Sequence, residues 1–333
     1  MPFERILGQP TAVTTLVRAL ESGRLHHAYR FEGPEGVGRE LAAVAFAQAL
    51  LCTAGVRLGC GTCDACRRAA TFSPGDGEGT GGVPLHPDFV VVERGLYSAE
   101  ALGRSTAEVR DISVDQVRRL VIARAGYPPH EGRARVFLVR RAEELGQSAA
   151  NALLKALEEP RPSTHFVLLT SAPERLLDTI RSRTLPVRFG PLSDEVLCEL
   201  CRARGLSDEA TTHAIELASG SIAAALAAAD PELVERRGRF IREARASIEA
   251  SDYGLAAAFA EALERDRDRL LADLGALAAD FVQEARAHAG SEPRRAERAA
   301  RRHALVLQAT QAVARNGSAS LAWLGLVAAM RRL

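Results

Sequence analysis

A glycine-rich loop near the N-terminus keeps the glycines of a phosphate-binding loop but not its last two residues. In the P-loop motif G-x-x-x-x-G-K-[ST], backbone N–H groups surround the phosphates, the lysine contacts the β/γ oxygens and the hydroxyl binds Mg²⁺. This sequence keeps Gly33, Gly36 and Gly38 but has Arg39 and Glu40 at the last two positions. A guanidinium fits poorly where a compact ammonium is needed, and a carboxylate repels phosphates. The loop is interpreted as a degenerate nucleotide site; an ordinary glycine-rich turn and weak nucleotide binding through Arg39 stay open.

The second acidic site of an ATPase is also replaced. A Walker B strand ends in Asp-Glu, one residue holding Mg²⁺ and the other orienting the attacking water. Here the apolar run 136–139 ends in Arg140 and Arg141, and two cations can do neither. Only Glu143 and Glu144, in the following turn, leave a route back to an active site. We therefore expect that ATP is not hydrolysed and not bound, and that the chain is not an enzyme by itself.

Four cysteines in a short stretch have the spacing of a metal site. Cys52, Cys60, Cys63 and Cys66 follow the pattern C-x₇-C-x₂-C-x₂-C. Four thiolates at this spacing can surround a zinc ion tetrahedrally, with Zn–S distances of about 2.3 Å. Because four protein ligands leave no position for water, we expect a structural zinc. Free thiols and an iron–sulfur cluster are the alternatives.

Another C-x₂-C pair, Cys198 and Cys201, lies in a helical pattern without further ligand candidates nearby in the sequence. Free cysteines are among the residues most often buried in protein cores. We interpret this pair as core cysteines rather than metal ligands.

Two arginines follow a short helical segment in the middle of the chain. Ser171 and Glu174 have the spacing of a capping box at its start, and Arg181 and Arg183 project from its end. Lys155 is the one lysine among 43 lysines and arginines, so exposed arginines are common in this chain. By themselves the two arginines are typical of a solvated surface.

The elements that must position these residues alternate between strand and helix in the first half of the chain. A strand at 28–31 precedes the glycine-rich loop and a helix at 41–51 follows it, which is the setting that a P-loop requires. Other apolar runs predict strands at 89–92, 136–139 and 166–169, with a helix at 149–159. This order predicts an α/β fold with a parallel sheet.

Helical patterns replace the strand patterns in the second half. The predicted domains are an α/β domain at 1–191 that contains the cysteine module at 52–66, a small helical domain at 192–232, and a helical bundle at 233–333. Two segments of the first domain are predicted to be loops, the glycine-rich 73–84 and the aperiodic 95–108.

The composition is that of an ordinary globular protein. Apolar residues make up 47%, charged residues make up 26%, and the net charge is +1. A protein that held nucleic acid alone through phosphate contacts would be more basic, so any DNA contact is local or shared with partners. The N-terminus has no signal-peptide pattern, and the longest apolar run, 41–52, is too short to cross a bilayer. We expect a cytoplasmic protein that does not associate with membranes.

Together these stretches make the chain resemble the bacterial clamp-loader subunits of the DNA polymerase III holoenzyme, over about residues 3–230. Besides the loop and the four cysteines, the matching segments are ILGQ at 6–9, GRLHHAY at 23–29, HPD at 86–88, NALLKALEEP at 151–160 and SRT at 182–184. The resemblance implies an AAA+ fold: a P-loop-type domain with an inserted zinc module, a small helical lid, and a C-terminal helical collar for oligomerisation.

The family contains motor subunits, which keep both ATPase motifs, and delta-prime subunits, which look like the motors but do not hydrolyse ATP. This chain agrees with the delta-prime branch, also at Ala223, where the motors carry a nucleotide-sensing arginine. In the family, the arginine of Ser-Arg-Cys reaches the ATP of the neighbouring subunit. The resemblance therefore implies that Arg183 is an arginine finger in trans. Thr184, in place of the cysteine, is expected to matter little because the charge lies on Arg183.

The resemblance also implies partners. These are gamma/tau motor subunits and a delta subunit in a hetero-pentamer, a sliding clamp, and primer–template DNA reached through the complex. The polymerase activity of the holoenzyme would reside in another subunit. Two other functions stay open: an active ATPase that uses Glu143 or Glu144, and a zinc-containing module that binds nucleic acid by itself.

Overall fold

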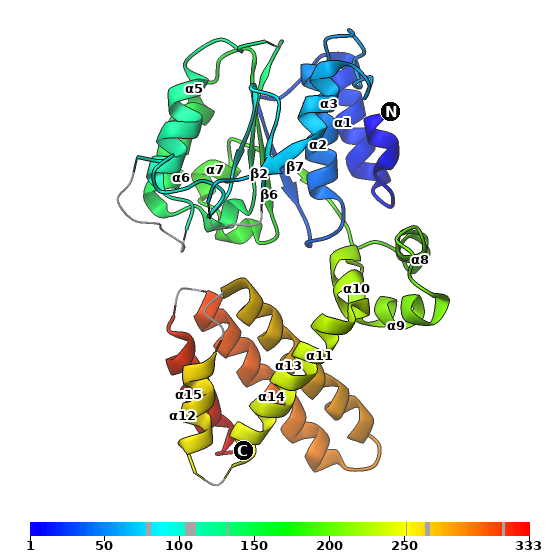
Figure 1. Cartoon of the computed structure of the whole chain (residues 1–333), viewed down its shortest axis with the longest axis vertical. Coiled ribbons are helices and arrows are strands. Elements are labelled where there is room, and N and C mark those ends of the chain that lie inside the picture. Colours follow the sequence, from blue (N-terminus) through cyan, green and yellow to red (C-terminus); the bar gives the residue numbers. More distant parts are fainter. Residues whose placement is uncertain (78–80, 104–110, 132, 251, 264–266, 315–316) are drawn as a thin grey trace. The chain divides into compact units, whose positions relative to one another are not determined.

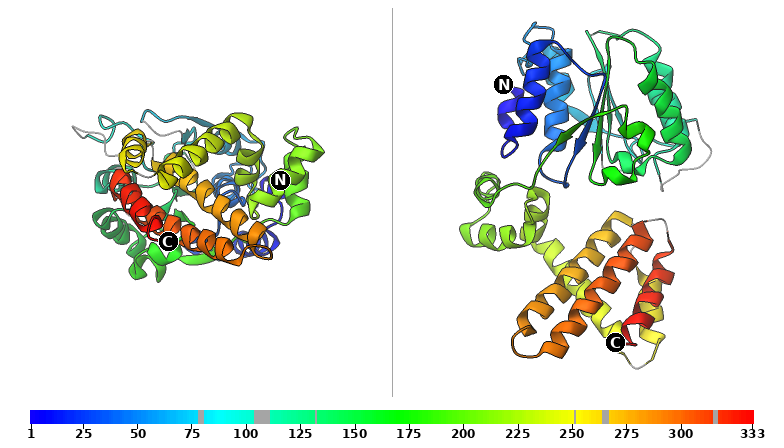
Figure 2. Two further views of the ribbon diagram at one scale, coloured as in Figure 1. Left: turned by 90° about the horizontal axis from the view of Figure 1, so that it is seen from below. Right: turned by 180° about the vertical axis from the view of Figure 1, so that it is seen from behind.

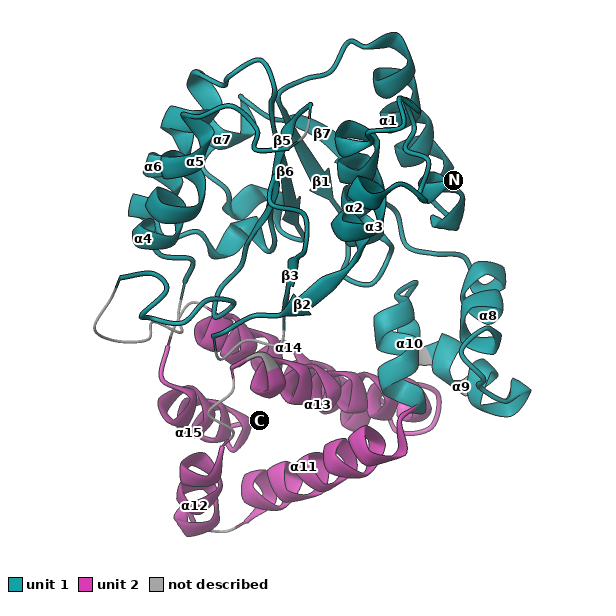
Figure 3. Ribbon diagram, turned by 45° about the horizontal axis from the view of Figure 1, so that its top comes forward, with its two compact units in different colours: residues 1–229 teal, residues 230–333 magenta. Residues whose placement is uncertain are grey.

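The chain divides into two compact units, Met1–Ala229 and Asp230–Leu333 (Figure 3). The computed structural model describes residues 1–77, 81–103, 111–131, 133–250, 252–263, 267–314 and 317–333. The predicted boundary between the helical bundle and the rest of the chain, at 232/233, lies close to the division between the units. Among the described residues, no helix is both long and apolar enough to cross a bilayer.

Unit 1 is built on a parallel sheet, which confirms the predicted α/β architecture (Figure 1). Its strands lie in the order β4 (Phe89–Val92), β5 (Arg135–Val139), β6 (Thr164–Thr170), β1 (Ala28–Glu32) and β7 (Leu185–Arg188). All neighbouring strands of this sheet pair in parallel. The strands β1, β4, β5 and β6 were each indicated by a continuous apolar run, as expected for strands buried on both faces.

Strand β7 was not predicted, because only Val187 in it is buried. An edge strand with three exposed residues, one of them a proline, lacks the apolar run on which the other predictions depend. Its backbone nevertheless pairs with β1, and Pro186 lies opposite Arg30.

Helices cover both faces of the sheet (Figures 1 and 2). On one face lie α1 (Pro10–Ser22), α2 (Arg39–Leu51) and α3 (Asp64–Ala70), whose core includes Tyr29 and Phe31 of β1. On the other face lie α4 (Val114–Gln116), the π-helical η2 (Val117–Ile122), α5 (Ala123–Ala125), α6 (Gln147–Glu158) and α7 (Asp178–Arg181). Side chains of β1 alternate between the two faces, so Ala28 belongs to the second core.

The first predicted loop, 73–84, is partly wrong. Its ends belong to two short antiparallel strands, β2 (Phe72–Pro74) and β3 (Gly82–Pro84). Their few residues with glycine and proline give no strand pattern. Residues 78–80 of this segment and 104–108 of the second predicted loop lie outside the described residues.

Three helices complete unit 1: α8 (Asp194–Arg202), α9 (Asp208–Ala218) and α10 (Ile222–Ala229). The Ser193 and Ser207 hydroxyls cap the N-termini of α8 and α9. The backbone N–H of Ile222 donates to the carbonyl of Gly36 at 3.1 Å, which places the start of α10 beside the glycine-rich loop.

Unit 2 is helical. It contains α11 (Pro231–Glu249), α12 (Gly254–Ala262), α13 (Arg267–His288), α14 (Pro293–Ala314) and α15 (Ala319–Met330). Phe281 of α13 and Trp323 of α15 are buried in its core.

Candidate functional site

The glycine-rich loop joins β1 to the start of α2, as the P-loop pattern predicts. Gly33 has φ +148° and Gly36 has φ +72°, values that side-chain-bearing residues rarely adopt. A Cβ atom on Gly33 would overlap the Phe189 carbonyl oxygen, and one on Gly36 would lie 2.7 Å from the Cβ of Ala223. Gly38 also has a positive φ, +99°, and caps α2. The glycines are thus required by the backbone conformation and by the close approach of α10.

A pocket of about 520 Å³ opens beside this loop. Its lining comes from the loop, from the end of β5 and from α10, because the carboxyl ends of parallel strands meet at one edge of a sheet. Gly36, Gly38, Arg39, Glu40, Arg140 and Arg141 all contribute to it. The structure therefore brings the residues of the two altered ATPase motifs to one place.

Arg140 is the central charge of this pocket. The residue is only 9% exposed. Its Nη1 lies 2.7 Å from Glu93 Oε2, and its Nη2 forms an ion pair with Glu40 Oε1. Its guanidinium also lies 5.6 Å from the ring centre of Phe72. Although burial opposes it, the carboxylates of Glu40 and Glu93 raise the pKa of Arg140, so the guanidinium is charged.

The remaining charges of the pocket are engaged in other contacts. Arg141, at φ +47°, lies 3.6 Å from Glu35 and 3.8 Å from Glu144. Glu144 is also 3.0 Å from Arg94. Glu143 Oε1 accepts hydrogen bonds from the N–H and the hydroxyl of Ser171, at 3.1 and 2.7 Å.

Arg39, which also lines the pocket, has a buried atom without a hydrogen bond to any residue that the structure describes. Burial lowers the pKa of Arg39, an effect that Glu143 and Glu35 oppose. Its Nη1 is buried without a hydrogen-bond partner among the described residues. The same holds for Oε2 of Glu143, in the turn after β5.

The chemistry open to this pocket follows from these contacts. Divalent magnesium is held by carboxylate, hydroxyl and phosphate oxygens. The Glu40 carboxylate is taken by Arg140, and the end of β5 supplies two guanidinium groups instead of acids. The arrangement disfavours a metal–phosphate complex where an active ATPase would hold one.

The four cysteines come together as the spacing predicts. Their Sγ atoms all lie within 4.8 Å of one another. Cys52 and Cys63, and likewise Cys60 and Cys66, have Sγ atoms 3.9 Å apart. Tetrahedral ligands at Zn–S distances of about 2.3 Å stand roughly 3.8 Å apart, so the group fits a zinc ion.

The surroundings of the cysteines act on them in different directions: backbone hydrogen bonds lower the pKa of Cys60, whereas burial raises the pKa of Cys66. Although burial opposes it, hydrogen bonds, the largest from the Cys66 backbone, lower the pKa of Cys63 to about 5. Gln48, the polar residue that interrupts an apolar run of α2, donates from Nε2 to the Cys66 carbonyl at 2.8 Å. Contacts of this kind fix the ligand loop.

The second pair of cysteines lies in α8, with Cys201 buried and Cys198 partly exposed. Burial raises the pKa of the Cys201 thiol. Within the described part of the chain, these residues join no group of potential metal ligands. This placement agrees with core cysteines for Cys201 and a core edge for Cys198.

Arg183 follows α7, at the edge where β7 begins. Its side chain is 37% exposed, and its Nη2 lies 2.8 Å from Glu158 Oε1 at the end of α6. Its Nη1 donates to the Thr179 carbonyl at 3.1 Å. In the isolated chain the guanidinium is therefore folded back onto α6 and α7, within reach of solvent.

The predicted capping box at Ser171 and Glu174 is wrong. The short helix after β6 is capped at Ala172, without a side-chain hydrogen bond. The Ser171 hydroxyl instead donates to Glu143, which approaches from the turn after β5. A tertiary contact has replaced the local one.

Three residues of these sites had not been singled out in the sequence: Glu93, Glu158 and Arg30. A signal existed for two of them. Glu93 directly follows the apolar run of β4, and Arg30 interrupts the apolar run of β1. A polar residue directly after a strand indicates a contact at the strand end, and a charged residue inside an apolar run indicates a buried charge with a partner.

The chain is similar in sequence to subunits of DNA polymerase III. A sequence model of the family described as DNA polymerase III, delta subunit, matches residues 8–193. The gamma/tau subunit of DNA polymerase III from Mycobacterium tuberculosis is 32% identical over 66% of this chain and 34% of its own length. The delta′ subunit from Bacillus subtilis is 31% identical over 57% of this chain and 50% of its own length. The chain thus spans a third to a half of these two relatives.

Among solved structures, a DNA polymerase III gamma subunit-related protein from Thermotoga maritima aligns over 95% of this chain and 98% of its own. The sequence identity is 15% and the TM-score is 0.45.

Proposed function

The chain belongs to the family described as DNA polymerase III, delta subunit, and we propose that it is a non-hydrolysing clamp-loader subunit of the delta-prime kind. Overall identity does not separate the two branches, since it is 32% to a gamma/tau subunit and 31% to a delta′ subunit. The residues of the degenerate site favour delta-prime. The chain would not turn over ATP, and the DNA-directed polymerase activity of the holoenzyme would reside in another subunit.

The observation that carries this proposal is the pairing of Arg140 with Glu40. A P-loop carboxylate repels phosphates by itself, and here it neutralises a cation where a Mg²⁺-binding acid is expected. The pairing places a partly buried, charge-assisted contact beside the glycine-rich loop. Hydrolysis would require this contact to open and acidic ligands to be supplied from elsewhere.

The second part of the proposal is that Arg183 serves a neighbouring subunit. An arginine finger stabilises charge on the transferring phosphoryl group in trans. Arg183 is partly exposed, and the carboxylate with which it pairs, that of Glu158, is itself 47% exposed. Exposed ion pairs of this kind are worth about 0–1 kcal/mol, so exchanging Glu158 for a triphosphate costs little.

The four cysteines would hold a structural zinc. Cys52, Cys60, Cys63 and Cys66 fill a tetrahedral set, so the ion would have no open position for catalysis. It would tie the end of α2 to α3, which the chain joins through a segment without other regular structure.

The partners belong to the proposal as well. Gamma/tau motor subunits and a delta subunit would complete a hetero-pentamer that places a sliding clamp on primer–template DNA in the cytoplasm. The domains would be an AAA+ domain at 1–191, a lid at 192–232 and a collar at 233–333. DNA would be reached through the complex, in keeping with a net charge of +1.

The test is ATP hydrolysis by the chain alone and by a loader reconstituted with motor and delta subunits. We expect no turnover alone; DNA-stimulated turnover that Glu143→Gln abolishes would show an active motor. In the loader, Arg183→Ala should lower hydrolysis at the neighbouring site at least about tenfold, since a finger is worth about 10³–10⁵ in kcat.

Arg181→Ala is the matched control. This arginine lies two residues away, is 43% exposed and pairs with Asp178 at 3.1 Å, so its loss should leave the rate unchanged. An unchanged rate with Arg183→Ala, or an equal fall with Arg181→Ala, would contradict the assignment. Tight binding of the isolated chain to primed DNA would instead support a stand-alone nucleic-acid-binding module.

A further inference from the structure

Arg30 is a buried cation in the middle of a central strand. It is 6% exposed and lies between Leu168 of β6 and Pro186 of β7 in the register of the sheet. A charge at such a position is unfavourable unless it is paired and hydrogen-bonded. Its contacts should therefore explain why the strand carries an arginine.

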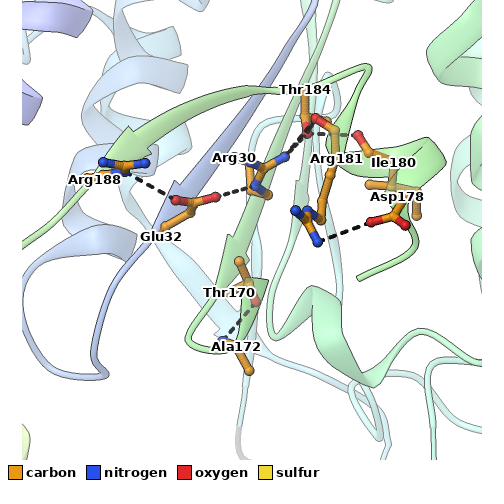
Figure 4. Close-up of polar contacts among 9 residues, drawn as sticks. All are labelled: Arg30, Glu32, Thr170, Ala172, Asp178, Ile180, Arg181, Thr184 and Arg188. Carbon is orange, nitrogen blue, oxygen red and sulfur yellow. Dashed lines mark hydrogen bonds and ion pairs between the residues drawn. The ribbon is translucent and has the colours of Figure 1, made fainter. Parts of the chain in front are cut away.

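The guanidinium of Arg30 connects β1 to the segment that contains Arg183 (Figure 4). Its Nε donates to Glu32 Oε1 at 2.6 Å. Its Nη1 donates to the Thr184 hydroxyl at 2.6 Å and to the Arg181 carbonyl at 2.9 Å. Arg188 approaches the same carboxylate of Glu32 at 3.8 Å, so the pair is also held from β7.

These contacts fix the chain on both sides of Arg183. The Arg181 carbonyl belongs to the last turn of α7, where carbonyls have no partner within the helix. The Thr184 hydroxyl accepts from Arg30 and donates to the Ile180 carbonyl at 2.9 Å. The backbone N–H of Arg183 itself donates to Ile180 at 3.1 Å. Arg183 is thus a partly exposed residue between two positions, Arg181 and Thr184, that Arg30 anchors to the sheet.

We propose that Arg30, through Thr184 and the Arg181 carbonyl, is a positioning residue that sets the direction of the Arg183 guanidinium. This inference rests on the proposed trans role of Arg183. A charged group acting on a transition state must be held within about 0.5 Å, and a displacement of about 1 Å can cost about 100-fold in rate. Without the hydrogen bonds from Arg30, the turn at 181–184 would not hold the Arg183 guanidinium within this distance.

Thr184 then has a role of its own: its hydroxyl links Arg30 to the turn that carries Arg183. A hydroxyl can donate and accept at once, whereas a thiol is a weak donor and a weak acceptor. The charge-assisted bond from Arg30 therefore suits threonine better than the cysteine that is usual in the family. Arg30 and Thr184 work as a pair.

The experiment compares Arg30→Leu, Thr184→Val and Thr184→Ser in the reconstituted loader, with loader assembly checked by size-exclusion chromatography. Leucine replaces the buried cation by an apolar group, and valine removes the hydroxyl without changing the shape. We expect both to lower kcat at least about threefold with KM for ATP unchanged, because the finger acts on the transition state. Thr184→Ser keeps the hydroxyl and should keep the rate. If Arg30→Leu does not assemble, Thr184→Val carries the test.

A double-mutant cycle separates positioning from general destabilisation. Adding Arg30→Leu to Arg183→Ala should change the rate by less than about 1.5-fold, since no finger remains to be positioned. An additive fall, or full activity of both Arg30→Leu and Thr184→Val while Arg183→Ala is impaired, would overturn this inference and leave the proposed function standing. If Arg183→Ala has no effect, the proposed function itself fails.

Discussion

The guanidinium of Arg140 forms an ion pair with the carboxylate of Glu40, which lies 100 residues earlier in the chain. These are the two residues that depart furthest from the motifs of an ATPase. Without Glu40, Arg140 would still pair with Glu93, whereas without Arg140 the Glu40 carboxylate would lose this ion pair. Together with Glu93 they form a polar network in which two carboxylates share one guanidinium. Arg140 therefore connects the glycine-rich loop to the ends of β4 and β5 through ion pairs.

We first predict that Arg140, with its two carboxylate partners, stabilises unit 1. Arg140→Met should lower the free energy of unfolding by about 3–5 kcal/mol, because it leaves Glu93 without its buried partner and removes the contact with Glu40. The measurement is urea unfolding followed by circular dichroism. Glu40→Gln should cost about 1 kcal/mol or less, because Glu40 is 49% exposed and Glu93 still pairs with Arg140.

Arg141→Gln is the matched control for Arg140. Arg141 is adjacent, more exposed, and lies 3.6 and 3.8 Å from its partners, so its loss should change the unfolding free energy by about 0–1 kcal/mol. If both substitutions lowered the unfolding free energy equally, the burial of Arg140 and its pairing with Glu93 would not account for the stabilisation.

The second prediction concerns the metal. The purified chain should contain about one zinc ion, measured by atomic emission spectrometry, because four thiolates close one tetrahedral site. Cys66→Ser should lose most of the metal and destabilise the segment between α2 and α3, since structural zinc contributes directly to folding. Cys198→Ser, in the separate pair on α8, should keep it. Iron in place of zinc, or metal retained by Cys66→Ser, would contradict the assignment.

The third prediction is a pH dependence that comes from His86. The imidazole is 1% exposed, its Nδ1 accepts from the Asp88 N–H at 3.1 Å, and burial lowers its pKa below 6.5. The unfolded state therefore binds more protons, and stability is lost as pH falls below about 6.5. We expect a loss on the order of 1 kcal/mol between pH 7 and 5.5 in urea unfolding.

His86→Asn tests the origin of this loss. The amide oxygen of an asparagine at position 86 can accept the hydrogen bond from the Asp88 N–H, but the amide does not titrate. The variant should show a shallower pH dependence between pH 7 and 5.5. His130→Asn is the control, because the exposed imidazole of His130 meets water in both states. An unchanged slope in His86→Asn would exclude His86 as the source.

Much of the sheet was predictable from residue order. Strands β4, β5 and β6 are short apolar runs because a parallel strand between two helical layers is buried on both faces. Edge strand β7 has no such run, so it was missed. The capping box at Ser171 failed for a different reason: a local hydrogen bond competes with tertiary ones, and Glu143 offered a better acceptor.

Residue types and their spacing predicted a degenerate ATPase site and a cysteine metal site. Arg39, Glu40, Arg140 and Arg141 replace the groups of an ATPase, and the spacing of four cysteines indicates a metal site, because residue types and short spacings are local properties. Which distant residues come into contact depends on the folded chain and could not be predicted. Glu40 with Arg140 and Arg30 with Thr184 are 100 and 154 residues apart, and no local pattern encodes contacts that form when strands from distant segments are placed side by side.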